Sequence, residues 1–536
     1  MSDGKRCNVF RRSGALLGGW LTEFKSVALL ALLAISFLPG QAAWTQTAPE
    51  ASGPYSTLII RNATIIDGSG APARGPVDIV IKKNIIEQVV AADPVSRAKG
   101  LGPGSAVPSD GRVIDAQGMY VIPGLIDVHV HFFDFLPREY QYKLLLGHGV
   151  TTVRHFSQYA PEPDLVEKQR SAENKISAPR LYVYGFWRAW PGDPRFTNAK
   201  DAPLVVREWK SKGVDGVKMA DLPGEYPDIF KAVADEVHRQ HMGLAVHISQ
   251  NAVYPMNAVR VAADGATTIE HHYGYAESSF RNRKIQALPS DYNYMIEADR
   301  FFQTGAVWLQ ADLKRLHTEV IDSLLATAAK SGFAMVPTFV VYEPNRDLER
   351  VKTFPWHEKF TMPQLMQMWK PNPKNHGSYF THWTSDNEAV WAQMFRRWME
   401  FVQDYKNRGG QVAVGSDVGY IYGLWGFSTI REMELLEHAG FNPLEALHSA
   451  TEVGAIALGN HQLGVIRPGY LADLVVLTAN PLEDFKVMYG SGATRQKADG
   501  ELTQVAGVKY TIRDGVVMDS QALLQDVQDM VAKAKK

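Results

Sequence analysis

The feature that most constrains the fold is the regular alternation of short apolar segments with helical stretches between residues 125 and 451. Eight of these segments have the length and composition of buried β-strands. They are Leu125–His131, Thr151–Phe156, Arg180–Gly185, Gly216–Ala220, Ala245–Ser249, Thr268–His272, Ala334–Thr338 and Gln411–Asp417. Strands that alternate with helices in this way predict an α/β fold of the (β/α)8 TIM-barrel type, with an inner ring of parallel strands covered by helices.

The residues on both sides of this region are predicted to form a small β domain. Short β runs separated by Gly, Pro and Asp turns are Thr57–Ile66, Val77–Lys82, Ile85–Val90, Arg112–Asp115, Leu471–Leu477, Val505–Ile512 and Gly515–Met518. Runs of this kind are typical of an all-β segment. We therefore expect a β-sandwich built from residues 56–123 and 456–520. The barrel, residues 124–455, is inserted between its halves, and a helical tail, residues 521–536, follows.

Residues 1–42 have the features of a secretory signal peptide. Basic residues precede an apolar run over residues 27–38, and Gly40 and Ala42 supply the small side chains that a signal peptidase requires. The apolar run is short for a membrane span, so a cleaved signal is favoured over an uncleaved anchor. We expect a flexible linker over residues 43–55 and a periplasmic or secreted protein with no stable membrane span after cleavage.

Composition and charge exclude several classes of function. Lys and Arg number 56 and Asp and Glu 57, for a net charge of −1, so there is no electrostatic case for binding nucleic acid. Cys7 is the single cysteine of the sequence, which excludes a disulfide framework and a cysteine-based zinc site. A metal ion in this protein would need histidine or carboxylate ligands.

The strongest local signal is the sequence PGLIDVHVH at Pro123–His131. His129 and His131 are two residues apart on a predicted strand, and alternating side chains place both on one face together with Asp127. Two imidazoles on one face, at the end of a barrel strand, are able to bind one divalent ion.

Other predicted strands carry polar residues on the same small-residue face. Lys218 shares its face with Gly216 and Ala220, and a lone lysine inside a barrel is costly to desolvate, so it must be paired, neutralised or modified. His247 and Asp417 lie on the corresponding faces of their strands. Strand alternation does not decide between His271 and His272, which follow the sixth strand.

These residues also have ordinary structural explanations, such as buried histidines, a salt-bridged lysine and a helix-capping aspartate. Their recurrence near the C-terminal ends of successive strands favours a shared site, because barrel enzymes place their active sites at that face.

The motifs resemble those of the amidohydrolase superfamily, in its imidazolonepropionase/prolidase-like branch with a carboxylated lysine. The matching segments are residues 123–131, 149–154, 213–218, 245–247, 269–271, 414–417, 445–447 and 463–476. The resemblance implies two divalent metal ions, with zinc the best-suited metal and manganese an alternative. The ligands that it implies are His129, His131, Lys218 as a carbamate formed with CO2, His247, His271 and Asp417.

The resemblance also implies roles for individual residues. His129 and His131 would hold the more buried metal, Lys218 would bridge the two, and the order Ile-Glu-His favours His271 over His272. Asp417 would be the general base that takes a proton from a metal-activated water. His272 or Tyr273 would stabilise the developing oxyanion.

Substrate recognition is less well defined by the sequence. The residues that we expect near the barrel mouth are His155, Arg188, Trp190 and Tyr342. Arg154, Arg188 and Arg195 are alternatives for pairing with a substrate carboxylate. The aromatic segment over residues 341–401 is either a lid or the core of inserted helices.

The implied function is hydrolysis of a C–N amide bond in an exported dipeptidase or N-acyl amino acid hydrolase, with a hydrophobic small-molecule substrate. A lactone, a cyclic amide or a carbamate hydrolysed at the same metal centre is the first alternative. A non-catalytic binding protein on the same scaffold is the second. The sequence leaves the formation of a homo-oligomer open.

Overall fold

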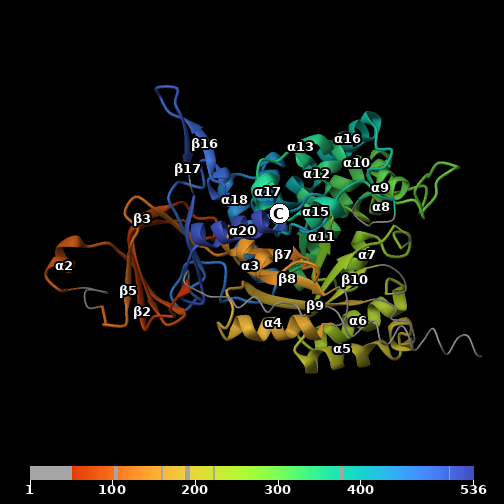
Figure 1. Cartoon of the computed structure of the whole chain (residues 1–536). Helices are drawn as coiled ribbons and strands as arrows, with labels where there is room; N and C mark the ends of the chain where they lie inside the picture. The colour runs from red at the N-terminus through yellow and green to blue at the C-terminus, as the bar shows by residue number, and fades with distance from the viewer. Residues whose placement is uncertain are drawn as a thin grey trace, which may run out of the picture. The chain divides into compact units, whose positions relative to one another are not determined.

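The barrel and the sheet beside it are both seen in the computed structural model (Figure 1). It describes residues 51–101, 107–157, 161–187, 193–220, 224–250, 252–373, 378–505 and 507–536. The predicted signal peptide and most of the predicted linker lie outside these residues.

Eight parallel strands form the barrel. They are β7 (Leu125–Val130), β8 (Val150–Ser157), β9 (Arg180–Trp187), β10 (Gly216–Ala220), β11 (Gly243–His247), β12 (Thr268–Glu270), β13 (Ala334–Val336) and β14 (Gln411–Val412). They pair in sequence order from β7 to β14. The ring closes where the segment after β14 meets β7, because Val128 N–H donates to Val414 O at 3.0 Å and Asp417 N–H donates to His129 O at 2.8 Å.

The two faces of each strand have different surroundings. In β10, Val217 and Met219 belong to the large apolar core between the strands and the helices. Lys218, between them in sequence, has its ammonium 4.2 Å from the centre of the Phe156 ring. Phe156 belongs to a small aromatic cluster with Tyr184. The polar residues near the strand ends therefore share the barrel interior with a few aromatic rings.

Helices follow the strands and cover the ring. They are α3 (Arg138–Gly147), α4 (Glu162–Ala172), α5 (Ala202–Lys212), α6 (Pro227–Arg239), α7 (Ala258–Ala263), α8 (Tyr275–Ser278), α11 (Ile321–Ser331), α17 (Phe427–His438), α18 (Pro443–Ser449) and α19 (Glu452–Ala457). Figure 1 shows α4 and α5 along the outer side of the strands near β9. In α6 the buried positions recur at helical spacing, which explains why this sequence forms a surface helix packed on a core.

Further helices are inserted after β12 and β13. They are α9 (Glu297–Ala306), α10 (Leu313–Arg315), α12 (Phe339–Arg346), α13 (Leu348–Lys352), α14 (His357–Phe360), α15 (Pro363–Met368) and α16 (Ser385–Asn407). Of the tryptophans within residues 341–401, Trp369, Trp391 and Trp398 are fully buried. These rings form the core of the inserted helices rather than a lid.

Strands from both ends of the chain form a second sheet of nine strands. They are β1 (Ala51–Ser52), β2 (Thr57–Ile65), β3 (Arg74–Lys82), β4 (Ile85–Ala91), β5 (Arg112–Asp115), β6 (Tyr120–Pro123), β15 (Leu474–Leu477), β18 (Val508–Arg513) and β19 (Val516–Asp519). By hydrogen bonding they form one continuous mixed sheet around an apolar core of its own, where we expected a sandwich. The linker is shorter than expected, because β1 pairs with β19.

Three smaller elements complete the fold. A helix, α2 (Pro94–Ala98), is capped by Asp93. A separate hairpin of β16 (Ala493–Gln496) and β17 (Leu502–Val505) extends away from the barrel in Figure 1. The C-terminal helix, α20 (Ser520–Ala534), packs on α3 and β18.

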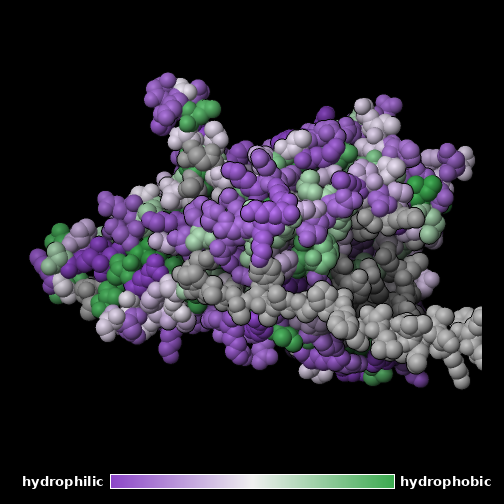
Figure 2. Space-filling view, in the orientation of Figure 1, coloured by the Kyte–Doolittle hydropathy of each residue, from purple (hydrophilic) through white to green (hydrophobic). Residues whose placement is uncertain are grey.

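The face drawn in Figure 2 is mostly hydrophilic, with hydrophobic side chains (green) at the end where β2, β3 and β5 lie. Exposed large hydrophobic residues of that part of the chain include Val95, Leu101 and Val113. Among the described residues, none of the helices has the length and apolarity needed to cross a membrane.

The fold predicts the effect of a single methyl group inside the barrel. Gly243 of β11 lies beside Gly216 of β10, and a Cβ on Gly243 would come within 2.7 Å of Tyr184 Cζ. We expect Gly243→Ala to lower the free energy of unfolding by about 1–3 kcal/mol, because overpacking a filled interior forces its neighbours to shift. Denaturant unfolding measures this change. Adding Tyr184→Phe to Gly243→Ala should recover part of the loss, and additive effects of the two substitutions would contradict the explanation.

Candidate active site

A cavity of about 210 Å³ opens at the C-terminal ends of the barrel strands. Its described lining residues are His129, His131, Phe186, Lys218, Ala220, His247, Gln250, His271, Tyr273, Tyr294, Arg300, Phe301, Val341, Tyr342, Asp417, Tyr420 and Ile421. Six of them are the metal ligands that the family resemblance implies.

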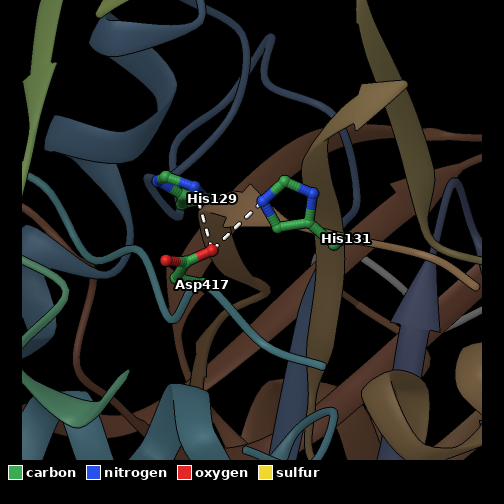
Figure 3. Close-up of side chains that lie close together, drawn as sticks. All are labelled: His129, His131 and Asp417. Atoms are coloured by element: carbon green, nitrogen blue, oxygen red, sulfur yellow. Dashed lines mark ion pairs between the residues drawn. The ribbon is translucent and has the colours of Figure 1, made fainter. Parts of the chain in front are cut away.

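Three of these residues meet at one point of the cavity (Figure 3). Asp417 Oδ1 lies 3.2 Å from His129 Nε2 and 3.1 Å from His131 Nε2. Ligand atoms of the three side chains all lie within 4.8 Å of one another. Burial alone would raise the pKa of Asp417, but the two histidines hold it well below its usual range. Burial lowers the pKa of His131 to about 4, so a neutral imidazole faces an ionised carboxylate, which is the protonation state that a divalent cation requires.

The backbone at the strand ends is turned in an unusual way. His271, Thr338 and Asp417 have φ values of 68°, 55° and 51°, in the left-handed region that side chains rarely adopt. Each comes directly or shortly after the end of a barrel strand. Strained backbone of this kind clusters at functional sites, where it directs a side chain that regular structure would point elsewhere.

A buried ion pair lies behind His129. His129 Nδ1–H donates to Glu270 Oε2 at 2.6 Å, and Arg154 donates through Nη2–H to Glu270 Oε1 at 2.8 Å. Burial alone would raise the pKa of Glu270, but Arg154, Lys218 and His129 hold it at about 2. The ionised carboxylate of Glu270 orients the His129 imidazole, whose Nε2 faces Asp417.

His247 and His271 form the second part of the ligand group. Their ring centres are 4.6 Å apart, and the His271 ring lies 5.0 Å from that of His129. His271 Nδ1 shares a hydrogen bond of 2.7 Å with Thr338 Oγ1. Burial places the pKa of His271 well below its usual value. Its Nε2 lies 3.8 Å from Asp417 Oδ2, so the second histidine pair borders the first site.

Lys218 lies in the cavity and is 2% exposed. Its Nζ has no hydrogen-bond partner among the described residues. Burial lowers its pKa to about 8. A buried ammonium without a hydrogen bond is costly, so this lysine carries the unsatisfied polar atom that a ligand or a modification would satisfy.

Tyr273 and Tyr342 also line the cavity, and their hydroxyl groups are hydrogen-bonded at 2.8 Å. Tyr342 was expected near the barrel mouth, and α12 places it there. No sequence pattern indicates that the two tyrosines meet, because they are 69 residues apart.

Two of the sequence-predicted residues lie elsewhere. His272 was expected to contact the oxyanion, but its ring packs 5.5 Å from Trp391 and 5.2 Å from Trp398, and burial lowers its pKa to about 3. His155 was expected at the mouth, but its Nε2 pairs with Asp164 Oδ2 at 3.1 Å. Neither lines the cavity. The substrate-binding candidates Arg188 and Trp190 lie outside the described residues.

The arginines expected to bind a carboxylate also have other roles. Arg154 is fully buried against Glu270, and Arg195 pairs with Asp193 and Glu208 away from the cavity. The arginine that does line the cavity is Arg300 of α9. It lies in an inserted helix that no motif marked, and basic residues of surface helices are too common to single one out.

Comparisons with known proteins agree with the site. The Amidohydrolase family model matches residues 384–518. A dihydroorotase from Thermoanaerobacter sp. (strain X514) is 40% identical over 74 residues, which are 14% of this chain and 14% of that protein. These matches support the resemblance to the amidohydrolase superfamily. Proteins of this superfamily generally use a divalent metal, and His129, His131 and Asp417 offer the donors for one.

Solved structures share the fold of this chain over most of its length. Bottromycin amidohydrolase has a TM-score of 0.61 at 19% identity and covers 89% of this chain and 91% of its own. A Xaa-Pro dipeptidase with bound methionine in its active site has a TM-score of 0.56 at 19% identity and covers 87% and 100%. The match to the dihydroorotase spans only about a seventh of that relative's length.

The ion pair between Glu270 and Arg154 behind His129 predicts that a substitution of Glu270 lowers the affinity for a metal ion. Glu270→Gln removes the charge that orients His129 and leaves Arg154 without its carboxylate, so we expect zinc affinity to fall about 10- to 100-fold. Competition with a chromophoric chelator measures the affinity. Asp164→Asn is the matched control, because Asp164 pairs with a buried histidine outside the cavity. Equal zinc affinity in Glu270→Gln and the wild type would contradict this role.

Proposed function

We propose that this protein is a metal-dependent hydrolase that cleaves the C–N amide bond of a small substrate, a dipeptide or an N-acyl amino acid with a hydrophobic side chain. The observation that carries the proposal is the meeting of His129, His131 and Asp417 at 3.1–3.2 Å in one cavity that also contains Lys218. Structural neighbours that include a Xaa-Pro dipeptidase and an amidohydrolase support C–N bond hydrolysis.

The donor set fits a metal centre of this kind. His129 and His131 present nitrogen atoms to the same carboxylate oxygen of Asp417, and His247 and His271 lie beside them. Neutral imidazoles and ionised carboxylates are the ligands that zinc prefers in the absence of cysteine. We propose that these residues hold two divalent ions, with Lys218 between the two groups of ligands.

Lys218 would complete the centre as a carbamate. Its unprotonated amine would add to CO2, with one N–C bond formed and one proton released to solvent, and the product is an anion with two oxygen ligands. The lowered pKa of Lys218, about 8, increases the fraction of amine available for this step. The modification would also remove the cost of a buried ammonium without a hydrogen bond.

The chain's own residues would then perform the proton transfers. A bound divalent ion would polarise the substrate carbonyl and lower the pKa of a water molecule. Asp417, which is ionised, accepts the proton of the attacking water and passes it to the leaving nitrogen. The Tyr273 hydroxyl, held by Tyr342, donates to the oxyanion that forms on the carbonyl oxygen. Apolar lining residues such as Phe186, Val341 and Ile421 would exclude water from the substrate side chain.

A defined panel of substrates tests the proposal. Protein incubated with Zn²⁺ or Mn²⁺ and bicarbonate would be assayed on N-acetyl-L-phenylalanine, alanyl-phenylalanine and phenylalanyl-proline, and on a homoserine lactone, dihydrouracil and a phenyl carbamate. We expect at least one of the three amides to release free amine, which mass spectrometry detects. Chelation of the metal should abolish this release. Turnover confined to the lactone, the cyclic amide or the carbamate would overturn the proposal in favour of that substrate class. No turnover together with no bound metal by elemental analysis would favour a binding protein.

Lys218→Ala should remove both metal and activity. Without the bridging group we expect fewer than two ions per chain by elemental analysis, and amide hydrolysis reduced by at least about 100-fold. Gln250→Ala is the control, because Gln250 lines the same cavity without belonging to the ligand set. Full metal content and full turnover in Lys218→Ala would contradict the two-metal centre.

We also propose that the protein is exported to the periplasm or secreted. The support is the sequence of residues 1–42, with its basic, apolar and small-residue regions in the order of a signal peptide. Expression of the full chain in a bacterial host, followed by N-terminal sequencing of the periplasmic fraction, is expected to give a protein that begins at Ala43. Recovery of the intact chain in the membrane fraction would indicate an uncleaved anchor.

A further inference from the structure

Besides Lys218, the cavity contains a second cationic side chain, that of Arg300, which is not one of the proposed metal ligands. Among its described lining residues, the two with a lysine or arginine charge are Lys218 and Arg300. Lys218 belongs to the proposed metal centre, whereas Arg300 comes from α9, a helix inserted after β12. The cavity therefore has a catalytic part built by the barrel strands and a basic part built by an insertion.

The structure holds the Arg300 guanidinium in a defined place. Its Nη2–H donates to Glu297 Oε1 at 2.8 Å, one turn earlier in the same helix. The guanidinium carbon lies 5.2 Å from the Tyr294 ring centre and 5.3 Å from that of Phe301, and both rings line the cavity. Because the side chain is 20% exposed, a ligand in the cavity can reach it.

This environment differs from that of the structural arginines nearby in the fold. Arg154 is 0% exposed and is bonded to Glu270, Thr268 and Val128 O through three of its nitrogen atoms. Arg300 makes its described hydrogen bond through a single nitrogen atom. A guanidinium has five N–H donors in a rigid fork that matches a carboxylate, and two aromatic rings beside it reduce competition from water.

We propose that Arg300 binds the carboxylate of the amino-acid half of the substrate and so makes the enzyme selective for N-acyl amino acids and dipeptides with a free C-terminus. This inference rests on the proposed amide hydrolysis. The charged end of the substrate lies at Arg300, and its amide lies at the metal ligands. Its apolar side chain lies against Phe186, Val341 and Ile421. Glu297 competes with the substrate for the guanidinium and so weakens carboxylate binding.

Two probes that differ only in the carboxylate test the proposal. They are N-acetyl-L-phenylalanine and N-acetyl-L-phenylalaninamide, with acetate release as the readout for both. We expect Arg300→Gln to raise KM for the acid about 10- to 100-fold, as loss of a charge-assisted hydrogen bond does, with kcat little changed. KM for the amide should stay within about two-fold of the wild type. For the acid, KM of Arg300→Lys should lie between that of the wild type and that of Arg300→Gln.

Glu297→Gln provides a change of opposite sign. Removal of the competing carboxylate should lower KM for the acid roughly two- to five-fold, the usual size of a partly exposed ion pair. If the pair had a purely structural role, Arg300→Gln and Glu297→Gln would instead both raise KM for the acid. Arg170→Gln is the matched control, because Arg170 makes the same i,i+3 pair with Glu167 on α4 and does not line the cavity.

The outcomes separate this inference from the proposed function. Unchanged KM values in Arg300→Gln, or equal losses on acid and amide, would overturn the role of Arg300 while the hydrolysis stands. If the wild-type protein releases no acetate from N-acetyl-L-phenylalanine, the same variants would be tested for inhibition of the active panel amide by L-phenylalanine and L-phenylalaninamide. An equal effect of Arg300→Gln on both inhibitors would overturn the proposal there. If no amide is hydrolysed, the proposed function itself fails.

Discussion

The site depends on one buried interaction, the contact of the Glu270 carboxylate with Arg154 and His129 inside the barrel. All three side chains are almost fully buried, so the charges are stable only as a set. Arg154 also bonds to Val128 O and Thr268, and therefore ties β7, β8 and β12 together. The same carboxylate that satisfies a structural arginine orients a histidine of the proposed metal site, so the barrel interior and the chemistry share one electrostatic network.

The barrel was predictable from the sequence because each strand is short, apolar and flanked by polar helices. Alternation along β10 also placed Lys218 inside the barrel. Alternation along β8 does not support the expected position of His155 at the barrel mouth. His155 lies on the same side of its strand as Val153, which belongs to the large apolar core between the strands and the helices. Arg154 and Phe156 take the inner face instead, and His155 is left to pair with Asp164.

Alternation also did not decide between His271 and His272, for a physical reason that the structure shows. Thr268 and Glu270 point inward, so a regular strand would have directed His272 inward as well. The strand ends at Glu270, and the left-handed backbone at His271 turns that side chain into the cavity. Arg300 and the Tyr273–Tyr342 pair could not be predicted either, because inserted helices bring together residues that no local pattern connects.

The short last strand, β14, has a consequence for the stability of the ring. β14 has only two residues, and the segment that contacts β7 lies after it. Closure of the ring therefore depends on the few contacts between β7 and residues 414–418. His129 and His131 stand on one side of this seam and Asp417 on the other. An ion held by all three would link the two sides of this junction. Occupancy and ring closure would then be thermodynamically linked, and each would favour the other.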